Sequence, residues 1–168
     1  MGKITEFYLS KKPDDIGRMI DDIWIFDNDH LETTHDYIQW LFPLKEKSLA
    51  VPNAPIIEDE EIEEFRNNAY LSRRVLHSLD VMLQFYGFER NDDEIIGFAT
   101  DFPDRCVYWQ GKNNHNYLRL TRIMRCLVLM NLSLYAYALH SLLLKCAVQK
   151  PEDFSEITLD FWRKIFEE

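Results

Sequence analysis

The sequence predicts an all-α fold, a single compact bundle of about seven helices with one nearly apolar central helix. Only 5 Gly and 6 Pro interrupt the 168 residues, and between them apolar residues recur at intervals near 3.6. Hydrophobic residues make up 46% of the chain and aromatic residues 14%, which provides enough apolar surface to drive burial of one core. A chain of this length fits a single domain, which we expect to span residues 1–168.

Three of the expected helices precede residue 70. The first opens at Asp14-Asp15 and ends by residues 27–29, with isoleucines at 16, 20 and 23 on one face. The second begins with Asp29 as its N-cap, uses Glu32 in a capping box, and ends before Pro43. After an extended proline-containing loop at 51–55, a short acidic helix covers about 59–67.

The longest predicted helix covers about 71–86 and carries a stripe of large apolar residues along one face. Gly87 supplies a left-handed residue that ends this helix. The segment 89–112 is the least regular part of the chain, and we expect a long loop with little structure there.

Three helices are expected after this loop. Asn114 caps one that runs to about Leu129, and Ser155 caps the last one. Between them, residues 131–148 are apolar nearly all round, so we expect this helix to lie buried at the centre of the bundle. The uncharged stretch 126–144 contains several polar residues, which favours two buried helices over one membrane span.

The charge balance argues against nucleic acid as a partner. Nineteen Lys and Arg residues against 29 Asp and Glu residues give a net charge of −10, which repels phosphate backbones and anionic lipid. No secretory signal is recognised at residues 1–12, and the 3 cysteines share no metal-ligand spacing. We therefore expect reduced thiols and a cytoplasmic protein.

A first candidate segment is Thr33–Leu44, which reads TTHDYIQWLFPL. Residues three, four or seven positions apart share one face of a helix. Glu32, His35 and Gln39 are therefore expected to align, with Asp36 beside them. This face carries a carboxylate and an imidazole.

A second candidate segment, His115–Arg122, reads HNYLRLTR and repeats the His-polar-Tyr pattern of the first. By the same spacing, His115, Arg119 and Arg122 form a cationic stripe next to Asn116. If the two helices face each other, the acidic and cationic stripes can pair.

Three interpretations of these segments remain open. In the first, the polar residues form structural ion pairs and complete hydrogen-bond networks. In the second, Arg119 and Arg122 bind a phosphate or carboxylate while His35 or His115 titrates near neutral pH. The third is a two-histidine metal site, but His30 and His35 lack the spacing of helical zinc motifs, so we predict no metal site.

Known enzyme signatures are missing from the sequence. It contains no Gly-rich phosphate loop and no Gly-x-Ser-x-Gly elbow. Most of the tryptophans are expected in the core, whereas Trp109 lies in the irregular 89–112 segment and is a candidate for exposure.

Both candidate segments closely resemble signature segments of the conserved domain of the opioid growth factor receptor family. The dodecamer 33–44 is the most specific, because its aromatic residues, Gln39 and Pro43 arise together by chance very rarely. Shorter pieces that add to the resemblance occur at 13–18, 31–32, 53–55 and 82–87. The resemblance covers about residues 13–165.

The resemblance implies a helical domain. In the animal receptors this domain belongs to a protein that binds an enkephalin peptide and restrains cell proliferation. The chain lacks the C-terminal repeat region of those receptors and looks more like a short, stand-alone microbial member, so binding of a peptide hormone does not follow. No catalytic residues are carried over from the family.

We therefore expect a helical ligand-binding, partner-binding or regulatory domain, with a site where the His35 and His115 helices meet beneath the 89–112 segment. The alternative is an enzyme of unknown reaction in which a histidine acts as acid or base and arginines bind an anion. The expected partner is a small anionic ligand, a peptide or a protein, without a cofactor; self-association through the apolar 127–148 region is a third alternative. The candidate site residues are Glu32, His35, Asp36, Gln39, Trp109, His115, Asn116, Arg119 and Arg122.

Overall fold

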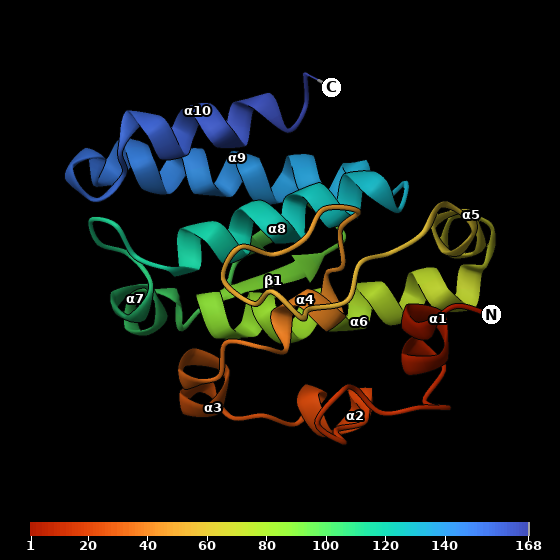
Figure 1. Ribbon diagram of the computed structural model, residues 1–168. Coiled ribbons are helices and arrows are strands. Elements are labelled where there is room, and N and C mark those ends of the chain that lie inside the picture. Colours follow the sequence, from red (N-terminus) through yellow and green to blue (C-terminus); the bar gives the residue numbers. More distant parts are fainter. Residues whose placement is uncertain (168) are drawn as a thin grey trace. The chain divides into compact units, whose positions relative to one another are not determined.

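The computed structural model describes residues 1–167, and these are mostly helical, as the sequence predicts (Figure 1). They contain ten α-helices, two short 3₁₀ helices and one two-stranded antiparallel sheet. The prediction of about seven helices is therefore wrong, and the sheet was not predicted. The difference arises because the N-terminal third folds into short helices and the expected long loop contains regular structure.

The chain forms two compact units. The N-terminal unit comprises Met1–Val81 with Leu129–Asn131, and the C-terminal unit comprises the other described residues. The helices of the N-terminal unit are α1 (Lys3–Tyr8), α2 (Ile20–Trp24), α3 (Asn28–Thr33), α4 (Ile38–Leu41), α5 (Asp59–Asn67) and most of α6 (Ala69–Tyr86).

The helix predicted from Asp14 is wrong for most of its length. Only α2 forms within the predicted range, and residues 9–19 are turns and extended chain. The side chain of Asp14 accepts hydrogen bonds from the backbone N–H groups of Ile16 and Arg18 at 3.1 and 2.9 Å, which closes a turn in place of a helix. Ile16 consequently points to solvent instead of into a helical apolar face.

The single helix predicted between Asp29 and Phe42 is also wrong, because the chain forms two short helices there. Asp27, not Asp29, caps α3 by accepting from the backbone N–H of His30 at 2.8 Å. Thr34 is extended, with φ −96° and ψ 130°, so α3 ends before His35. The second helix, α4, is a single turn whose four residues are all buried.

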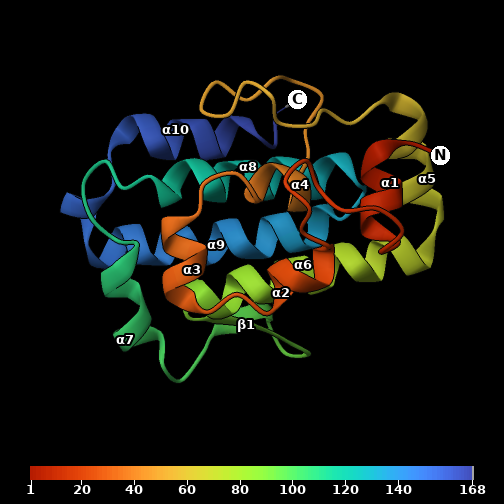
Figure 2. The ribbon, with the colours of Figure 1, turned by 60° about the horizontal axis from the view of Figure 1, so that its bottom comes forward.

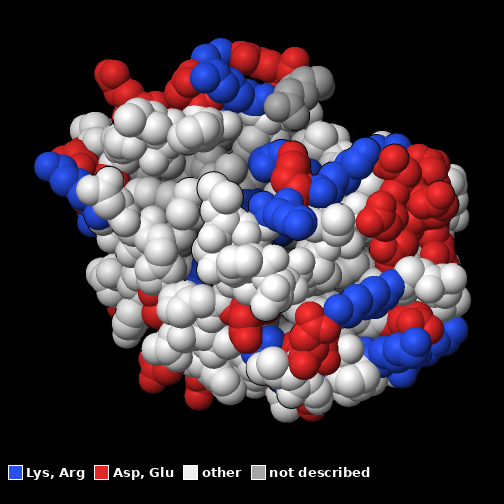
Figure 3. Space-filling model, viewed as in Figure 1, with Lys and Arg blue, Asp and Glu red and all other residues white. Residues whose placement is uncertain are grey.

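The predicted range of the acidic helix is confirmed by α5, in which Ile62 and Phe65 are buried as expected. Acidic side chains gather over α5 in a space-filling view (Figure 3), as expected for a solvated face. Glu61 is the exception, because it is 5% exposed and its Oε1 accepts from the backbone N–H of Thr5 at 3.0 Å. This carboxylate links α1 to α5 within the N-terminal unit.

The C-terminal unit contains the end of α6, where the predicted glycine stop is confirmed by a φ of +84° at Gly87. Residues 89–112 are not the predicted loop, because most of them form an antiparallel hairpin and short helices. These elements are β1 (Phe88–Asn91), β2 (Ile95–Phe98), α7 (Phe102–Arg105) and the 3₁₀ helix Cys106–Tyr108. Strands β1 and β2 pair so that Phe88 faces Phe98 and Asn91 faces Ile95.

The last three helices confirm the sequence prediction closely. They are α8 (Asn116–Leu129), α9 (Ser133–Gln149) and α10 (Glu156–Lys164), and they lie side by side in Figures 1 and 2. Ser155 caps α10 by accepting from the backbone N–H of Thr158 at 3.1 Å, as predicted. A left-handed residue at Asn131, with φ +62°, separates α8 from α9.

The expectation that the apolar helix α9 is buried all round is wrong. Ala136, Leu139 and Leu143 are buried, but four large apolar side chains of this helix are exposed to solvent. Strand β2 packs against α9, and α10 lies along it. In residues 1–167, none of the helices has both the length and the apolar character to cross a lipid bilayer.

The three cysteines are free and buried. Burial raises the pKa of the Cys126 and Cys146 thiols to about 12. Because the thiolate is the nucleophile, we expect these two thiols to resist iodoacetamide at about pH 8 in the native protein. Mass spectrometry should find all three alkylated after unfolding, and rapid native labelling of Cys126 would contradict the buried placement.

Candidate binding site

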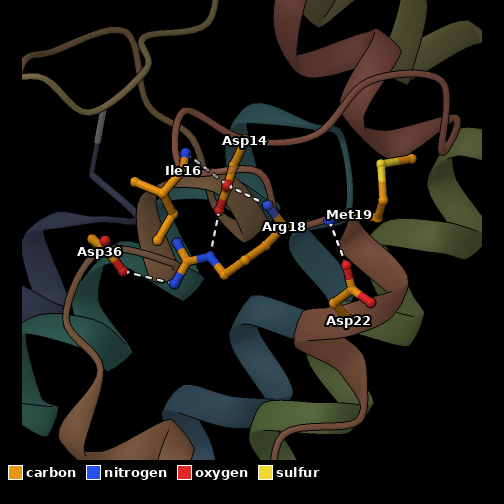
Figure 4. A network of polar contacts seen from close by, with 6 residues as sticks. All are labelled: Asp14, Ile16, Arg18, Met19, Asp22 and Asp36. Carbon is orange, nitrogen blue, oxygen red and sulfur yellow. Dashed lines mark hydrogen bonds and ion pairs between the residues drawn. The ribbon is translucent and has the colours of Figure 1, made fainter.

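The first candidate segment is anchored by an arginine between two carboxylates (Figure 4). Arg18 Nε donates to Asp14 Oδ2 at 2.6 Å, and Arg18 Nη1 donates to Asp36 Oδ1 at 2.9 Å. Asp14 is buried, so its charge is balanced by the guanidinium at short range. Asp36 therefore holds the chain between α3 and α4 against the 14–18 turn, a structural role that sequence spacing did not reveal.

Glu32, His35 and Gln39 do not share a helix face, because the helix that would align them is broken at Thr34. Glu32 is half-buried near the end of α3, and His35 is exposed in the connection that follows. Gln39 lies in α4 and is 4% exposed, and its Oε1 has no hydrogen-bond partner among the described residues. The predicted continuous acidic stripe is therefore wrong.

The second candidate segment starts α8 and is fixed by asparagines. Asn114 Oδ1 accepts from the backbone N–H and the Nδ2 of Asn116, at 2.9 and 3.1 Å, which confirms the predicted cap. Asn116 is fully buried, and its Oδ1 also lies 3.4 Å from the hydroxyl of Tyr86. His115 precedes the helix and is exposed, with Nε2 3.4 Å from Asn116 Nδ2.

The cationic stripe predicted on α8 is split between interior and surface. Arg119 is 5% exposed, and its Nη1 lies 3.5 Å from Asn116 Oδ1, so the guanidinium belongs to the interior of the C-terminal unit. Arg122 is half-buried, and His115 lies outside the helix. A surface anion cannot reach Arg119 without displacing its surroundings. The predicted pairing of the His35 and His115 segments stays a prediction.

Trp109 is a core residue, as expected for most of the tryptophans, and the exposure for which its place in the 89–112 segment made it a candidate is not found. It is completely buried, and its Nε1 donates to the backbone carbonyl of Tyr86 at 2.9 Å. Its ring meets those of Tyr86, Phe88 and Tyr117 edge-on, with centroids 5.5, 5.8 and 6.5 Å away. A ligand cannot stack on it.

One hollow of the C-terminal unit lies between α9 and α10, and it includes none of the candidate residues. This α9–α10 groove has a volume of about 390 Å³. Leu144 and Leu159 give it an apolar surface, His140 lines it from α9, and charged residues of α10 surround it. The charged residues are Glu156, Asp160 and Arg163.

His140 is the chemically distinctive residue of the groove. Its Nε2 is buried without a hydrogen-bond partner among the described residues, and its ring lies 5.0 Å from that of Phe166. Burial lowers the pKa of the imidazole from 6.5. An isolated histidine within an apolar helix is the sequence signal that points to this position.

Two of these charged residues, Asp160 and Arg163, are held in place by ion pairs. Asp160 pairs with Lys164 at 2.7 Å and also with Arg163, which in turn pairs with Glu167. Hydrogen bonds from Lys164 and Arg163 lower the pKa of the half-buried Asp160, which keeps this carboxylate charged. The groove thus combines an apolar surface with an ordered, charged edge.

The comparison that decides the family is a match over almost the whole chain. Residues 5–167 match the model of the opioid growth factor receptor conserved region. The chain belongs to this family. The family resemblance of the two candidate segments is thereby confirmed, and the matched range includes the α9–α10 groove.

Members of the opioid growth factor receptor family that resemble the chain are much longer. Opioid growth factor receptor-like protein 1 from Rattus norvegicus is 38% identical over 133 residues, which is 72% of this chain and 27% of the relative. The opioid growth factor receptor from Homo sapiens is 35% identical over 118 residues, which is 66% of this chain and 17% of the relative. The chain thus spans at most about a quarter of these curated relatives, and no solved structure matches it.

The lowered pKa of His140 predicts how stability depends on pH. The folded protein binds the imidazole proton less readily than the unfolded chain does. The free energy of unfolding is therefore not reduced by His140 above pH 6.5, and it falls as the pH drops below 6.5 because the unfolded chain takes up this proton first. We expect His140→Phe to weaken this loss, measured by urea unfolding over a pH series. The exposed-site control His115→Leu should keep it, and equal pH profiles for wild type and His140→Phe would contradict the assignment.

Proposed function

We propose that the chain is a partner-binding domain that takes a peptide segment in the α9–α10 groove. The observation that carries the proposal is the groove itself, with leucine side chains between charged residues on its α10 side. Binding sites for peptides and small molecules are concave and mostly apolar, with a few polar groups that fix orientation. The half-buried His140 offers such a polar group.

The charge of the groove favours a peptide over a small anion. Glu156 and Asp160 oppose the single cation Arg163, and the whole chain carries a net charge of −10. Both charges repel an anion and attract a partner with a basic group beside its apolar side chain. The relatives are named receptors, which supports binding as the shared type of activity.

The enzymatic alternative has less support. It requires His115 or His35 to act on a substrate that an arginine holds, but Arg119 is buried with Asn116 in the interior of its unit. His115 is exposed and does not line the α9–α10 groove. We therefore propose a structural role for Asn116 and Arg119.

The proposal is tested by titrating the chain with an opioid growth factor peptide, a panel of basic peptides with aromatic residues, and inorganic phosphate. We expect a peptide to shift backbone NMR signals of α9 and α10, and Leu144→Asp to remove the shift by placing a charge in the groove. The matched control is Leu118→Asp on α8, because Leu118 is also an exposed leucine of a helix. Shifts from no peptide, or shifts that survive Leu144→Asp, would refute the groove as the site.

A further inference from the structure

The face of α9 that is open to solvent carries an apolar stripe. Leu134, Tyr137, Leu144 and Val148 are 59, 51, 41 and 82% exposed. Together with the exposed Ser141, their positions are separated alternately by three and four residues. This spacing is that of the seam by which one helix packs along another. The stripe is therefore arranged for contact with a helix.

A hollow of about 290 Å³ adjoins this stripe on the side of the hairpin. It is lined by Glu94, Ile95 and Ile96 from the hairpin and by residues of α9 that include Tyr137, Ser141 and Lys145. Ile95 has a φ of +69°, which is rare for a β-branched residue and is found where a loop is held in a fixed shape. The apolar stripe and the hollow lie next to each other. The stripe of one copy can therefore pack into the hollow of another copy.

The hollow carries one charge of each sign, Glu94 from the hairpin and Lys145 from α9. Arg90, which pairs with Ile96 in the hairpin, lies 5.7 Å from the ring of Tyr135 near the start of α9. Strand β1 runs in the direction opposite to α9 (Figure 1), so the turn that follows β1 lies toward the N-terminal end of α9. Glu94 belongs to this turn. Lys145 lies in the C-terminal half of α9. Neither side chain forms an ion pair with another described residue.

We propose that two copies of the chain associate through antiparallel α9 helices, with Ser141 on the two-fold axis. In this register Leu134 faces Val148 of the second copy, and Lys145 faces Tyr137. Because Glu94, Tyr137 and Lys145 line one hollow, each lysine then approaches the glutamate of the other copy in addition to that of its own. Parallel helices would bring like charges together. A small residue on the axis lets the helices approach closely.

This dimer goes beyond the proposed function and does not depend on it. Leu144 belongs both to the apolar stripe and to the α9–α10 groove, whereas Leu134, Ser141 and the hairpin residues line only the hollow and His140 and Leu159 line only the groove. Peptide binding can therefore fail while the dimer forms, or the reverse. Substitutions at Glu94, Ser141 and Lys145 leave the residues that line the α9–α10 groove unchanged.

Sedimentation velocity over a concentration series tests the dimer. We expect wild type to approach twice the mass of the chain, and Glu94→Lys or Lys145→Glu alone to weaken association about tenfold or more. Mixing equal amounts of these two variants should restore dimers, because both intermolecular contacts then join opposite charges. Recovery of dimers on mixing would show that the two charges meet between copies, because a salt bridge within one chain would stay broken in both variants.

Cross-linking tests the register. Ser141→Cys should form a disulfide-linked dimer under mild oxidation, since an axial residue meets its own copy and the native cysteines are buried. Val148→Cys alone should not, but should cross-link when mixed with Leu134→Cys. A chain that stays monomeric at all concentrations, a mixture that stays monomeric, or a monomer that instead binds phosphatidylcholine vesicles through Leu134 would overturn the proposal.

Discussion

Replacing Trp109 with alanine is expected to lower the free energy of unfolding by about 3–5 kcal/mol, as for other large aromatic residues removed from a core. The side chain is fully buried, and its rings meet three aromatic neighbours in the C-terminal unit. Alanine removes these contacts and leaves the Tyr86 carbonyl without its indole donor. Urea unfolding followed by circular dichroism measures the loss.

Two companion variants separate the causes. Trp109→Phe keeps an aromatic ring but lacks the N–H, so we expect a smaller loss, about 1–3 kcal/mol. Phe161→Ala removes an aromatic side chain of α10 that is exposed, and should change stability by about 0.5 kcal/mol or less. If Trp109→Ala cost no more than Phe161→Ala, Trp109 would have to be accessible and could serve as a stacking surface.

The longer helices could be predicted because their ends depend on neighbouring residues in the sequence. Asn114 and Ser155 accept hydrogen bonds from backbone N–H groups two and three residues later, and Gly87 takes the left-handed conformation that ends α6. Between such ends, the apolar stripes of α6 and α8 extend over several turns. Both kinds of signal are local, and no distant contact is needed to read them.

The N-terminal third and the hairpin could not be predicted in the same way. Helices α1 to α4 have only four to six residues, which is too short for a helical period to appear. The Asp14 turn depends on a side chain that caps backbone N–H groups, and it competes with a helix of similar local sequence. Each strand of the hairpin has four residues, and β2 is stabilised by packing against α9, far away in the sequence.

The candidate residues show the same limit. The sequence singled out Asp36 and Asn116 correctly as members of polar networks, but not Arg18 as the partner of Asp36. Arg119 was placed on a cationic stripe from helical spacing alone, and spacing does not tell which face of a helix is covered. His140 was not a candidate, because its significance depends on α10, which closes the groove beside it.

Replacing Gly87 with alanine should destabilise the protein strongly for two separate reasons. At φ +84° an L side chain is strained, which costs about 1–2 kcal/mol. A Cβ atom there would also lie 2.9 Å from the backbone Cα of Phe102 and from Cβ of Arg105, too close for ordinary contact. Moving α7 away to relieve this costs a further ~1–3 kcal/mol. Urea unfolding measures the combined effect.

Gly17 provides the matched control, because its φ of +93° is close to that of Gly87 and a Cβ built on it meets no atom within 4 Å. Gly17→Ala should therefore show the conformational cost alone, and the difference between the two variants reports the close approach of α7 to the end of α6. If both variants lost the same free energy of unfolding, the start of α7 would move away from the added Cβ atom at Phe102 without a measurable cost. The glycine would then serve only to end the helix, and the hairpin that follows it would not be held at its base by α7.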